Sequence, residues 1–187
     1  MAAGRIALAA PATTAADQPY FTTRGVILLE EDLTLADWPE RAKTAGLNTI
    51  ALHAPLSPRK LAKFVQSDKG QEFLGRCRKL ALAVEYENHA MKDLLPRELF
   101  EKDRNLFRMN EKGERVGDYN FCVHSKQALE IVTQNAVEIA KILRPSTSRY
   151  FFWGDDGCPW CKCPKCAELS ETDQTLLVEN RLIEALR

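Results

Sequence analysis

Short apolar runs alternate with helical segments along this chain four times. The apolar runs cover residues 24–30, 47–53, 80–89 and 149–153. The helical patterns that follow them begin at Thr34, Lys60, Ser125 and Ser170. Four successive βα units predict parallel strands joined by right-handed crossovers, because parallel neighbours need a long connection and its hand is nearly invariant.

Capping residues support several of these boundaries. Thr34 precedes Asp37 by three residues, and Ser170 precedes Asp173 by three, the spacing of a capping box. Gly46 is placed to close the first helix. The second helix is expected to break near Gly70, and the last helix to continue to Arg187.

A long polar excursion, residues 91–125, interrupts the pattern and carries a turn signal at 110–113. Two architectures fit the four units: a small open doubly wound sheet, or the first half of a (β/α)8 barrel, which needs about 250 residues when complete. The first strand is not followed by a glycine-rich phosphate loop, which weakens the nucleotide-binding version. We therefore expect an α/β fold, a partial barrel of parallel βα units over 23–187, preceded by a disordered tail over 1–22.

Composition excludes several classes of partner. Lys plus Arg and Asp plus Glu each number 26, so the basic excess of a nucleic-acid-binding protein is missing. No apolar run approaches the roughly 20 residues of a membrane helix. The Ala/Thr-rich segment 1–19 is expected to be a tail, since its apolar run Ile6–Ala10 is short for a signal peptide. A cleaved signal, and with it a secreted or periplasmic location, is the alternative.

Polar side chains stand where the predicted strands end. The first strand ends in Glu30, the second in His53, the third in Glu87 and His89, and the fourth in the pair at 155–156. The carboxyl ends of parallel strands form the ligand face of such folds. Glu85, Glu87 and His89 share one face by the two-residue period, and burying their carboxylates is costly without partners. The pattern predicts a binding or catalytic site at this edge.

A dense cysteine cluster follows the fourth strand. Cys158, Cys161, Cys163 and Cys166 fall within nine residues, with only one residue between the two CxxC pairs. Zinc ribbons put roughly 15–20 residues there, so a site made of all four would be cramped. Cys161, Cys163 and Cys166 together with the remote Cys122 give a better tetrahedral zinc site. A disulfide within the loop or to Cys122 is an alternative.

A third reading of the cluster is a redox dithiol at Cys158 and Cys161, since a CxxC beside an aromatic residue is also found in thioredoxin-like proteins. The sixth cysteine, Cys77, lies on an apolar helical pattern and is expected in the core.

Several segments together carry a family resemblance. They are Glu87-Asn88-His89-Ala90, Asp93-Leu94-Leu95-Pro96, Leu106-Phe107-Arg108-Met109, Asn120-Phe121-Cys122-Val123, Trp153-Gly154-Asp155-Asp156 and Cys161-Lys162-Cys163-Pro164-Lys165-Cys166. In this order they resemble an uncharacterised bacterial family of glycoside-hydrolase-like barrel domains, over residues 24–187. That family is in turn distantly similar to the β-hexosaminidases, retaining glycosidases that use substrate assistance.

The resemblance implies a carbohydrate site with named roles. Asp155 matches the residue that orients the acetamido group of the substrate in β-hexosaminidases. Asp156 stands where those enzymes have the glutamate that protonates the leaving oxygen. An oxocarbenium-like transition state also needs a negative or nucleophilic group across the sugar, and Glu87 or Asp155 is expected to be this helper. Because Asp156 follows an aromatic strand, we expect apolar walls around its carboxyl group.

The remaining expectations concern the ligand and the partners. His89, His53, Glu30 and Trp153 are expected to bind a glycan, with Trp153 and Trp160 as exposed stacking surfaces. A non-catalytic module, in which the cysteine loop clasps the fold, is the alternative. The unpaired edges of a partial barrel predict self-association.

Overall fold

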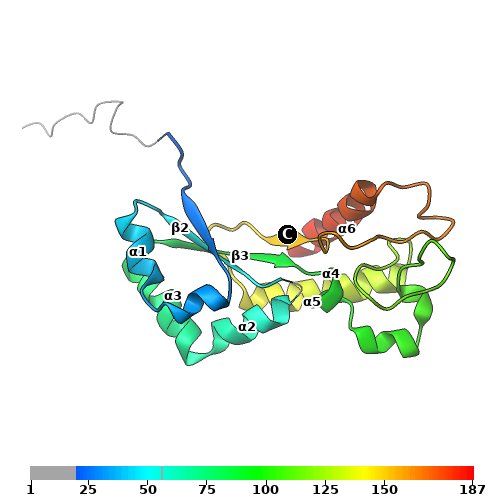
Figure 1. Cartoon of the computed structure of the whole chain (residues 1–187), viewed down its shortest axis with the longest axis horizontal. Helices are drawn as coiled ribbons and strands as arrows, with labels where there is room; N and C mark the ends of the chain where they lie inside the picture. The colour runs from blue at the N-terminus through cyan, green and yellow to red at the C-terminus, as the bar shows by residue number, and fades with distance from the viewer. Residues whose placement is uncertain (1–19, 56) are drawn as a thin grey trace, which may run out of the picture.

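A four-stranded parallel sheet forms the centre of the protein (Figure 1). The computed structural model describes residues 20–55 and 57–187. The strands, in spatial and chain order, are β1 (Gly25–Leu28), β2 (Thr49–His53), β3 (Ala83–His89) and β4 (Phe151–Trp153). The prediction of an all-parallel α/β fold is confirmed. Of the predicted tail, residues 1–19 lie outside the described residues.

The connections contain helices of very different length. The α-helices are α1 (Trp38–Thr44), α2 (Pro58–Gln66), α3 (Asp68–Lys79), α4 (Met91–Leu94), α5 (Lys126–Ile142) and α6 (Glu171–Leu186). Short 3-10 helices are η2 (Glu31–Thr34), η3 (Arg97–Glu101) and η4 (Arg104–Leu106). Within the described ranges, no helix combines the length and apolar character needed to cross a bilayer.

The two faces of the sheet differ in chemistry because successive side chains alternate between them. One face is apolar and forms the core, with Ile50, Leu52, Val84 and Tyr86 all buried. The opposite face carries the alternate residues of each strand. His53 pairs with Glu87, Glu87 with Phe151 and His89 with Trp153, and Glu85 lies on the same face of β3. The predicted common face of Glu85, Glu87 and His89 is therefore confirmed.

Two helix boundaries differ from the sequence prediction. Thr34 does not cap a helix: it ends η2, and α1 begins only at Trp38, where Pro39 suits the first turn. The predicted break near Gly70 occurs instead at Ser67, whose side chain accepts a hydrogen bond from the amide of Gly70 and so starts α3. A serine that caps the next helix stops the previous one, because its extended backbone leaves the helical ladder.

Other boundary signals are confirmed. Ser125 caps α5, and Ser170 with Asp173 forms the predicted capping box at the start of α6. Gly46 follows α1 with φ of 76°, and Gly113 closes the predicted turn with φ of 79°. Both conformations favour glycine, which has no Cβ.

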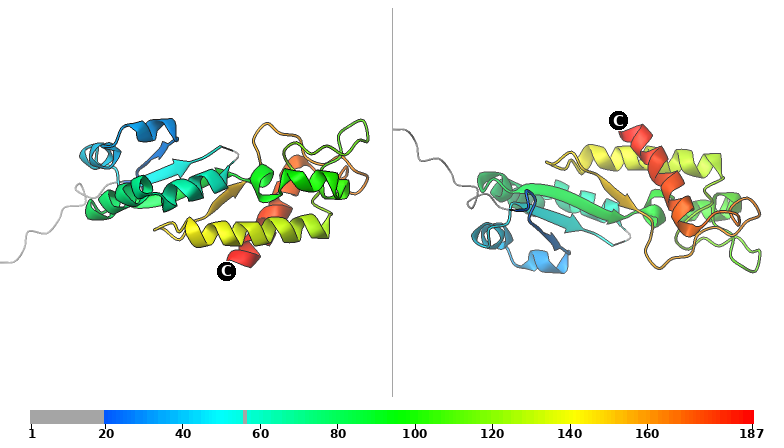
Figure 2. Two further views of the ribbon diagram at one scale, coloured as in Figure 1. Left: turned by 90° about the horizontal axis from the view of Figure 1, so that it is seen from below. Right: turned by 90° about the horizontal axis from the view of Figure 1, so that it is seen from above.

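The carboxyl ends of the strands lead into two long loops that lie side by side. The first, residues 95–125, contains η3 and η4. The second, residues 154–170, connects β4 to α6 (Figures 1 and 2). All three views place them together at one end of the molecule, beyond the carboxyl ends of β3 and β4. The fold thus concentrates irregular backbone where the sequence predicts a site.

Gly70→Ala should lower the free energy of unfolding by about 1–3 kcal/mol, the usual cost of overpacking. An added Cβ would lie 2.0 Å from the carbonyl oxygen of Phe64 and 2.9 Å from the Cα of Val65, both backbone atoms. Gly75→Ala in the same helix is the matched control, because its Cβ would meet nothing closer than 3.8 Å. This control should gain up to about 1 kcal/mol from helix propensity. Chemical denaturation of both variants checks the contrast, and equal effects would contradict it.

Candidate metal centre and carboxyl-edge site

Four buried cysteines meet between the two long loops. The sulfur atoms of Cys122, Cys161, Cys163 and Cys166 all lie within 4.8 Å of one another. The Sγ of Cys122 is 3.9 Å from those of Cys163 and Cys166. Tetrahedral zinc with Zn–S bonds of about 2.3 Å separates its sulfurs by about 3.8 Å. The cluster is therefore consistent with a metal such as zinc, and no second group of three potential ligands occurs in residues 20–55 and 57–187.

Hydrogen-bond donors and a cationic side chain lie next to the sulfur atoms of the cluster. Cys161 Sγ accepts a hydrogen bond from the amide of Met109 at 3.3 Å and faces the Arg115 guanidinium at 3.8 Å. His124 Nδ1 lies 3.2 Å from Cys166 Sγ. Sequence analysis missed these partners, although the Cys-x-His spacing of residues 122–124 was a usable signal. A cation site needs such donors, since four thiolates exceed the charge of a divalent ion.

The thiols interact strongly with one another. The hydrogen bond from Cys161 lowers the pKa of Cys122 to about 4, and the same bond raises the pKa of Cys161. Burial raises the pKa of Cys166 to about 12. A bound divalent cation would deprotonate all of its sulfur ligands.

The other two cysteines stand apart from the cluster. Cys77 is fully buried, as predicted for a core residue, and burial raises its pKa to about 11. Cys158 is half-buried, and burial raises its pKa as well. All six cysteines are free thiols, so the disulfides considered from the sequence are not formed in this structure. The redox dithiol at Cys158 and Cys161 stays a prediction, because a reduced dithiol also has two free thiols.

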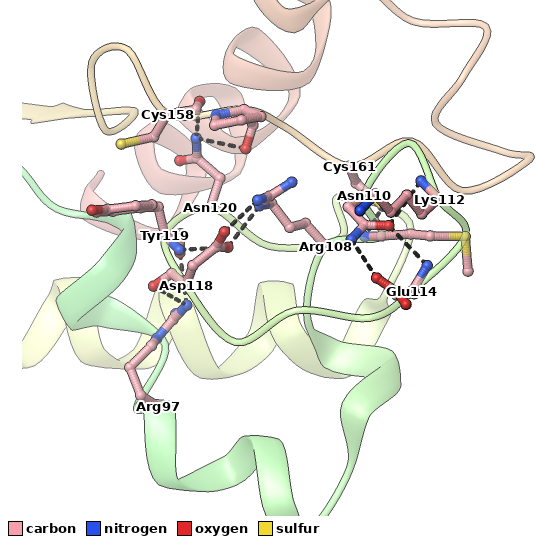
Figure 3. Close-up of polar contacts among 12 residues, drawn as sticks. Arg97, Arg108, Asn110, Lys112, Glu114, Asp118, Tyr119, Asn120, Cys158 and Cys161 are labelled. Carbon is pink, nitrogen blue, oxygen red and sulfur yellow. Dashed lines mark hydrogen bonds and ion pairs between the residues drawn. The ribbon is translucent and has the colours of Figure 1, made fainter.

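Polar contacts join the two loops beside the cluster (Figure 3). The Asn120 amide donates to the carbonyl of Cys158 at 2.8 Å. The amide of Lys162 donates to the carbonyl of Met109 at 2.8 Å. Arg108 pairs with Asp118 inside the first loop and fixes its path.

A buried glutamine ties the cysteine loop to the last helix. Gln174 on α6 is fully buried, accepts a hydrogen bond from the amide of Cys161 at 3.2 Å and donates to its carbonyl at 3.1 Å. Gln174 was not singled out from the sequence, and Asn120 was noted only as part of the segment Asn120-Phe121-Cys122-Val123, without a structural role. A lone buried amide leaves no periodic signal, and only the fold reveals its partners.

Two imidazoles are held in fixed orientations at the carboxyl edge of the sheet. His53 Nδ1 donates to the carbonyl of Glu87 at 2.9 Å, and His89 Nδ1 donates to the carbonyl of Gly154 at 2.8 Å. The carbonyl partners fix the proton on Nδ1, which leaves Nε2 as the free acceptor in the neutral rings. The two rings meet edge to face, 5.4 Å between centroids, and His89 also lies 5.3 Å from Trp153.

The two aspartates after β4 lie in opposite environments, and that of Asp156 differs from the expectation. Asp156 was expected among apolar walls, but its side chain is 88% exposed, and its Oδ2 lies 3.4 Å from His89 Nε2. Asp155 is 3% exposed: its Oδ2 accepts from the amide of Lys92 at 2.8 Å, while its Oδ1 is buried without a partner. Burial raises the pKa of Asp155 above its ordinary 3.8. The expected environment of Asp156 is wrong: this residue lies past the end of β4 in the loop, where its side chain faces solvent.

The strand-end acids are not all in one place. Burial raises the pKa of Glu87, helped by the charge of Glu85. Glu85 is itself buried and paired with Arg149 at 2.5 Å, so the buried carboxylate has the partner it needs. Glu30 is exposed and paired with Lys60, and it shares only a small cavity of about 30 Å³ with His53.

A polar cavity of about 930 Å³ opens beside this edge. Its floor includes Trp153, Asp155 and Asp156, and its walls come from both long loops and α6. Trp160 lines it but is only 4% exposed, so the expectation that it is an exposed stacking surface is wrong. Trp153 is half-buried and can still offer a ring face.

Comparisons with protein families and with characterised proteins found no match. The site must therefore be interpreted from its own geometry.

Cys163→Ser should release the metal that we expect in the purified protein at about one zinc per chain. It should also destabilise both loops, because the binding energy of a structural metal is folding energy. Cys158→Ser is the matched control: it lies in the same loop, outside the cluster, and should keep the metal. Elemental analysis with thiol counting decides, and a metal-free wild type with a loop disulfide would contradict the expectation.

The stability of the protein should depend on pH through Asp155. Its pKa is raised in the fold, so it contributes most below the ordinary aspartate pKa of 3.8, and this contribution is lost as pH rises through the folded pKa. Asp155→Asn cannot ionise. The free energy of unfolding of the wild type minus that of the variant should fall as the pH rises from 3.8 through the raised folded pKa, by about 1.4 kcal/mol for each unit by which the pKa is raised. The exposed Asp156→Asn is the control, and a flat difference for Asp155→Asn would refute the assignment.

Proposed function

We propose that this chain is a glycoside-hydrolase-like domain that binds carbohydrate at the carboxyl end of its sheet, with zinc at the four cysteines holding the loops around the site. The observation that carries this proposal is the pair of fixed imidazoles. His53 and His89 are each anchored through Nδ1 to a backbone carbonyl and present Nε2 on one sheet face, beside Glu87, Trp153 and Asp156.

Sugar recognition needs this mixture of groups. Each hydroxyl both donates and accepts, so it pairs well with a fixed acceptor such as Nε2 and with carboxylate oxygens. The Glu87 and Asp156 carboxyl groups supply such oxygens, and Trp153 offers an apolar surface to the C–H face of a sugar ring. A large cavity lined by Trp153, Asp156 and several other charged residues adjoins this edge, and such a mixed lining suits a ligand that is polar at its hydroxyls and apolar on its ring faces.

The cysteine cluster would stabilise the two loops that form part of this site. Cys122 belongs to the first long loop, and the other three cysteines belong to the second. These loops supply Arg108, Lys112 and Lys162 to the cavity walls. When bound, zinc would supply no chemistry to a sugar at this position; it would fix the two loops against each other.

Hydrolysis is a second candidate function, and the environment of Asp155 favours it. A carboxyl group whose pKa is raised by burial keeps its proton and can act as a general acid. Its unpartnered Oδ1 and its place in the cavity lining suit that role better than the solvated Asp156. This proposal moves the acid role from Asp156 to its neighbour.

His89→Ala should weaken glycan binding at least about 10-fold, the loss of one well-placed hydrogen bond to a partly charged site. Calorimetry with a panel of oligosaccharides measures this, and the exposed Glu130→Ala on α5 is the control. Reducing ends released from the same panel separate hydrolysis from binding alone. A wild type that binds no glycan, although folded and metal-loaded, would overturn the proposed function.

A further inference from the structure

Both edge strands of the sheet are open in the part of the chain that the structure describes. β1 pairs only with β2, and β4 pairs only with β3. An open edge presents unpaired amides and carbonyls and is a template for another strand. A short edge strand is one way to prevent pairing with another chain. β4 has only three residues, but all three are aromatic, so its edge remains a favourable surface for another strand.

An apolar groove lies along the open edge of β4. Its volume is about 490 Å³, and Tyr150, Phe151, Leu182, Ile183 and Leu186 line it. The last three belong to one face of α6, since spacings of three and four residues share a face of a helix. α6 thus covers β4 on one side and overhangs the position of a fifth strand.

The two ends of the groove differ in polarity. Its apolar part lies beside β4, and Trp153 and Glu179 line both this groove and the polar cavity at the carboxyl edge. An occupant should therefore be apolar at one end and polar at the other, with the polar end towards the carboxyl edge of the sheet.

β1 of another copy has this pattern. The strand is apolar, Ile27 is 56% exposed and Leu29 is 39% exposed, and the acids at 30–32 follow directly. Placed parallel to β4, it would bring Ile27 to the sheet face of Phe151 and Trp153, which both line the groove. Its acids would lie at the rim of the large cavity at the carboxyl edge. Both strands end in acids at that rim, where water and salt screen their repulsion. The antiparallel orientation would bury those acids in the apolar groove at a larger cost.

We propose that this groove receives β1 of a second copy of the chain. A two-fold axis parallel to the strands places each β1 beside the β4 of the other copy, so two identical seams form at once. The result is a closed ring of eight parallel strands, the number found in (β/α)8 barrels, and closure removes every open edge. The faces that bear His53, Glu87 and His89 then line one shared interior. The inference is independent of whether the site binds carbohydrate.

Light scattering and analytical ultracentrifugation of the full chain test this. The wild type should be a dimer, and Ile183→Asp should weaken association at least 10-fold. Leu176→Asp is the matched control. Leu176 and Ile183 both lie on α6, and Leu176 is 50% exposed while Ile183 is 48% exposed, but only Ile183 lines the groove. Circular dichroism should show that both variants keep the fold.

The second seam partner makes the test specific. Ile27→Lys in β1 should also give a monomer, and mixing it with Ile183→Asp should restore dimers, because the mixed pair keeps one unaltered seam. If Ile27→Lys remains a dimer while Ile183→Asp does not, two β4 edges meet instead and the proposal is wrong. A wild type that is monomeric at high concentration, with slow hydrogen exchange along β4, would show that another segment occupies the groove and would also overturn it.

Discussion

Four sulfur atoms buried within 4.8 Å of one another join two loops that are otherwise irregular. The loops have little regular structure of their own, and few backbone ladders connect them. Thiols packed this closely interact unfavourably once more than one is ionised, and a divalent cation removes that conflict by binding all of them. Both loops also supply residues to the lining of the large cavity, among them Arg108 and Lys162. Asn120 and Gln174 reinforce it by fixing the backbone of the cysteine loop to the first loop and to α6.

The carboxyl edge is organised by backbone carbonyls rather than by charge pairs. His53 and His89 use carbonyls of the neighbouring strand or loop to set their tautomer and direction. These bonds require no second side chain, and they leave Nε2 of each ring pointing away from its carbonyl partner; Nε2 of His89 lies 3.4 Å from the exposed Asp156 carboxylate. Such anchoring restricts the rings before a ligand arrives and reduces the entropy lost on binding.

The sequence signals that worked were local. The βα alternation predicted the parallel sheet, and Ser125, Ser170 and Gly46 marked helix boundaries because capping and left-handed backbone involve only a few neighbouring residues. The predicted helix break at Gly70 was wrong because a second local signal lies three residues earlier. Ser67 caps α3 and so ends the preceding helix before Gly70. The half-barrel curvature of the sheet stays a prediction.

The sequence by itself determined the elements, their parallel order and the four residues of the sulfur cluster, since periodicity, caps and cysteine spacing are properties of the chain alone. Only the tertiary structure decided which acids are buried. It placed Asp155 under the amide of Lys92, exposed Asp156, paired Glu30 with Lys60 and enclosed Trp160. Adjacent residues of the same type receive opposite environments because burial depends on contacts between segments some 30 to 65 residues apart, and no local pattern encodes those contacts.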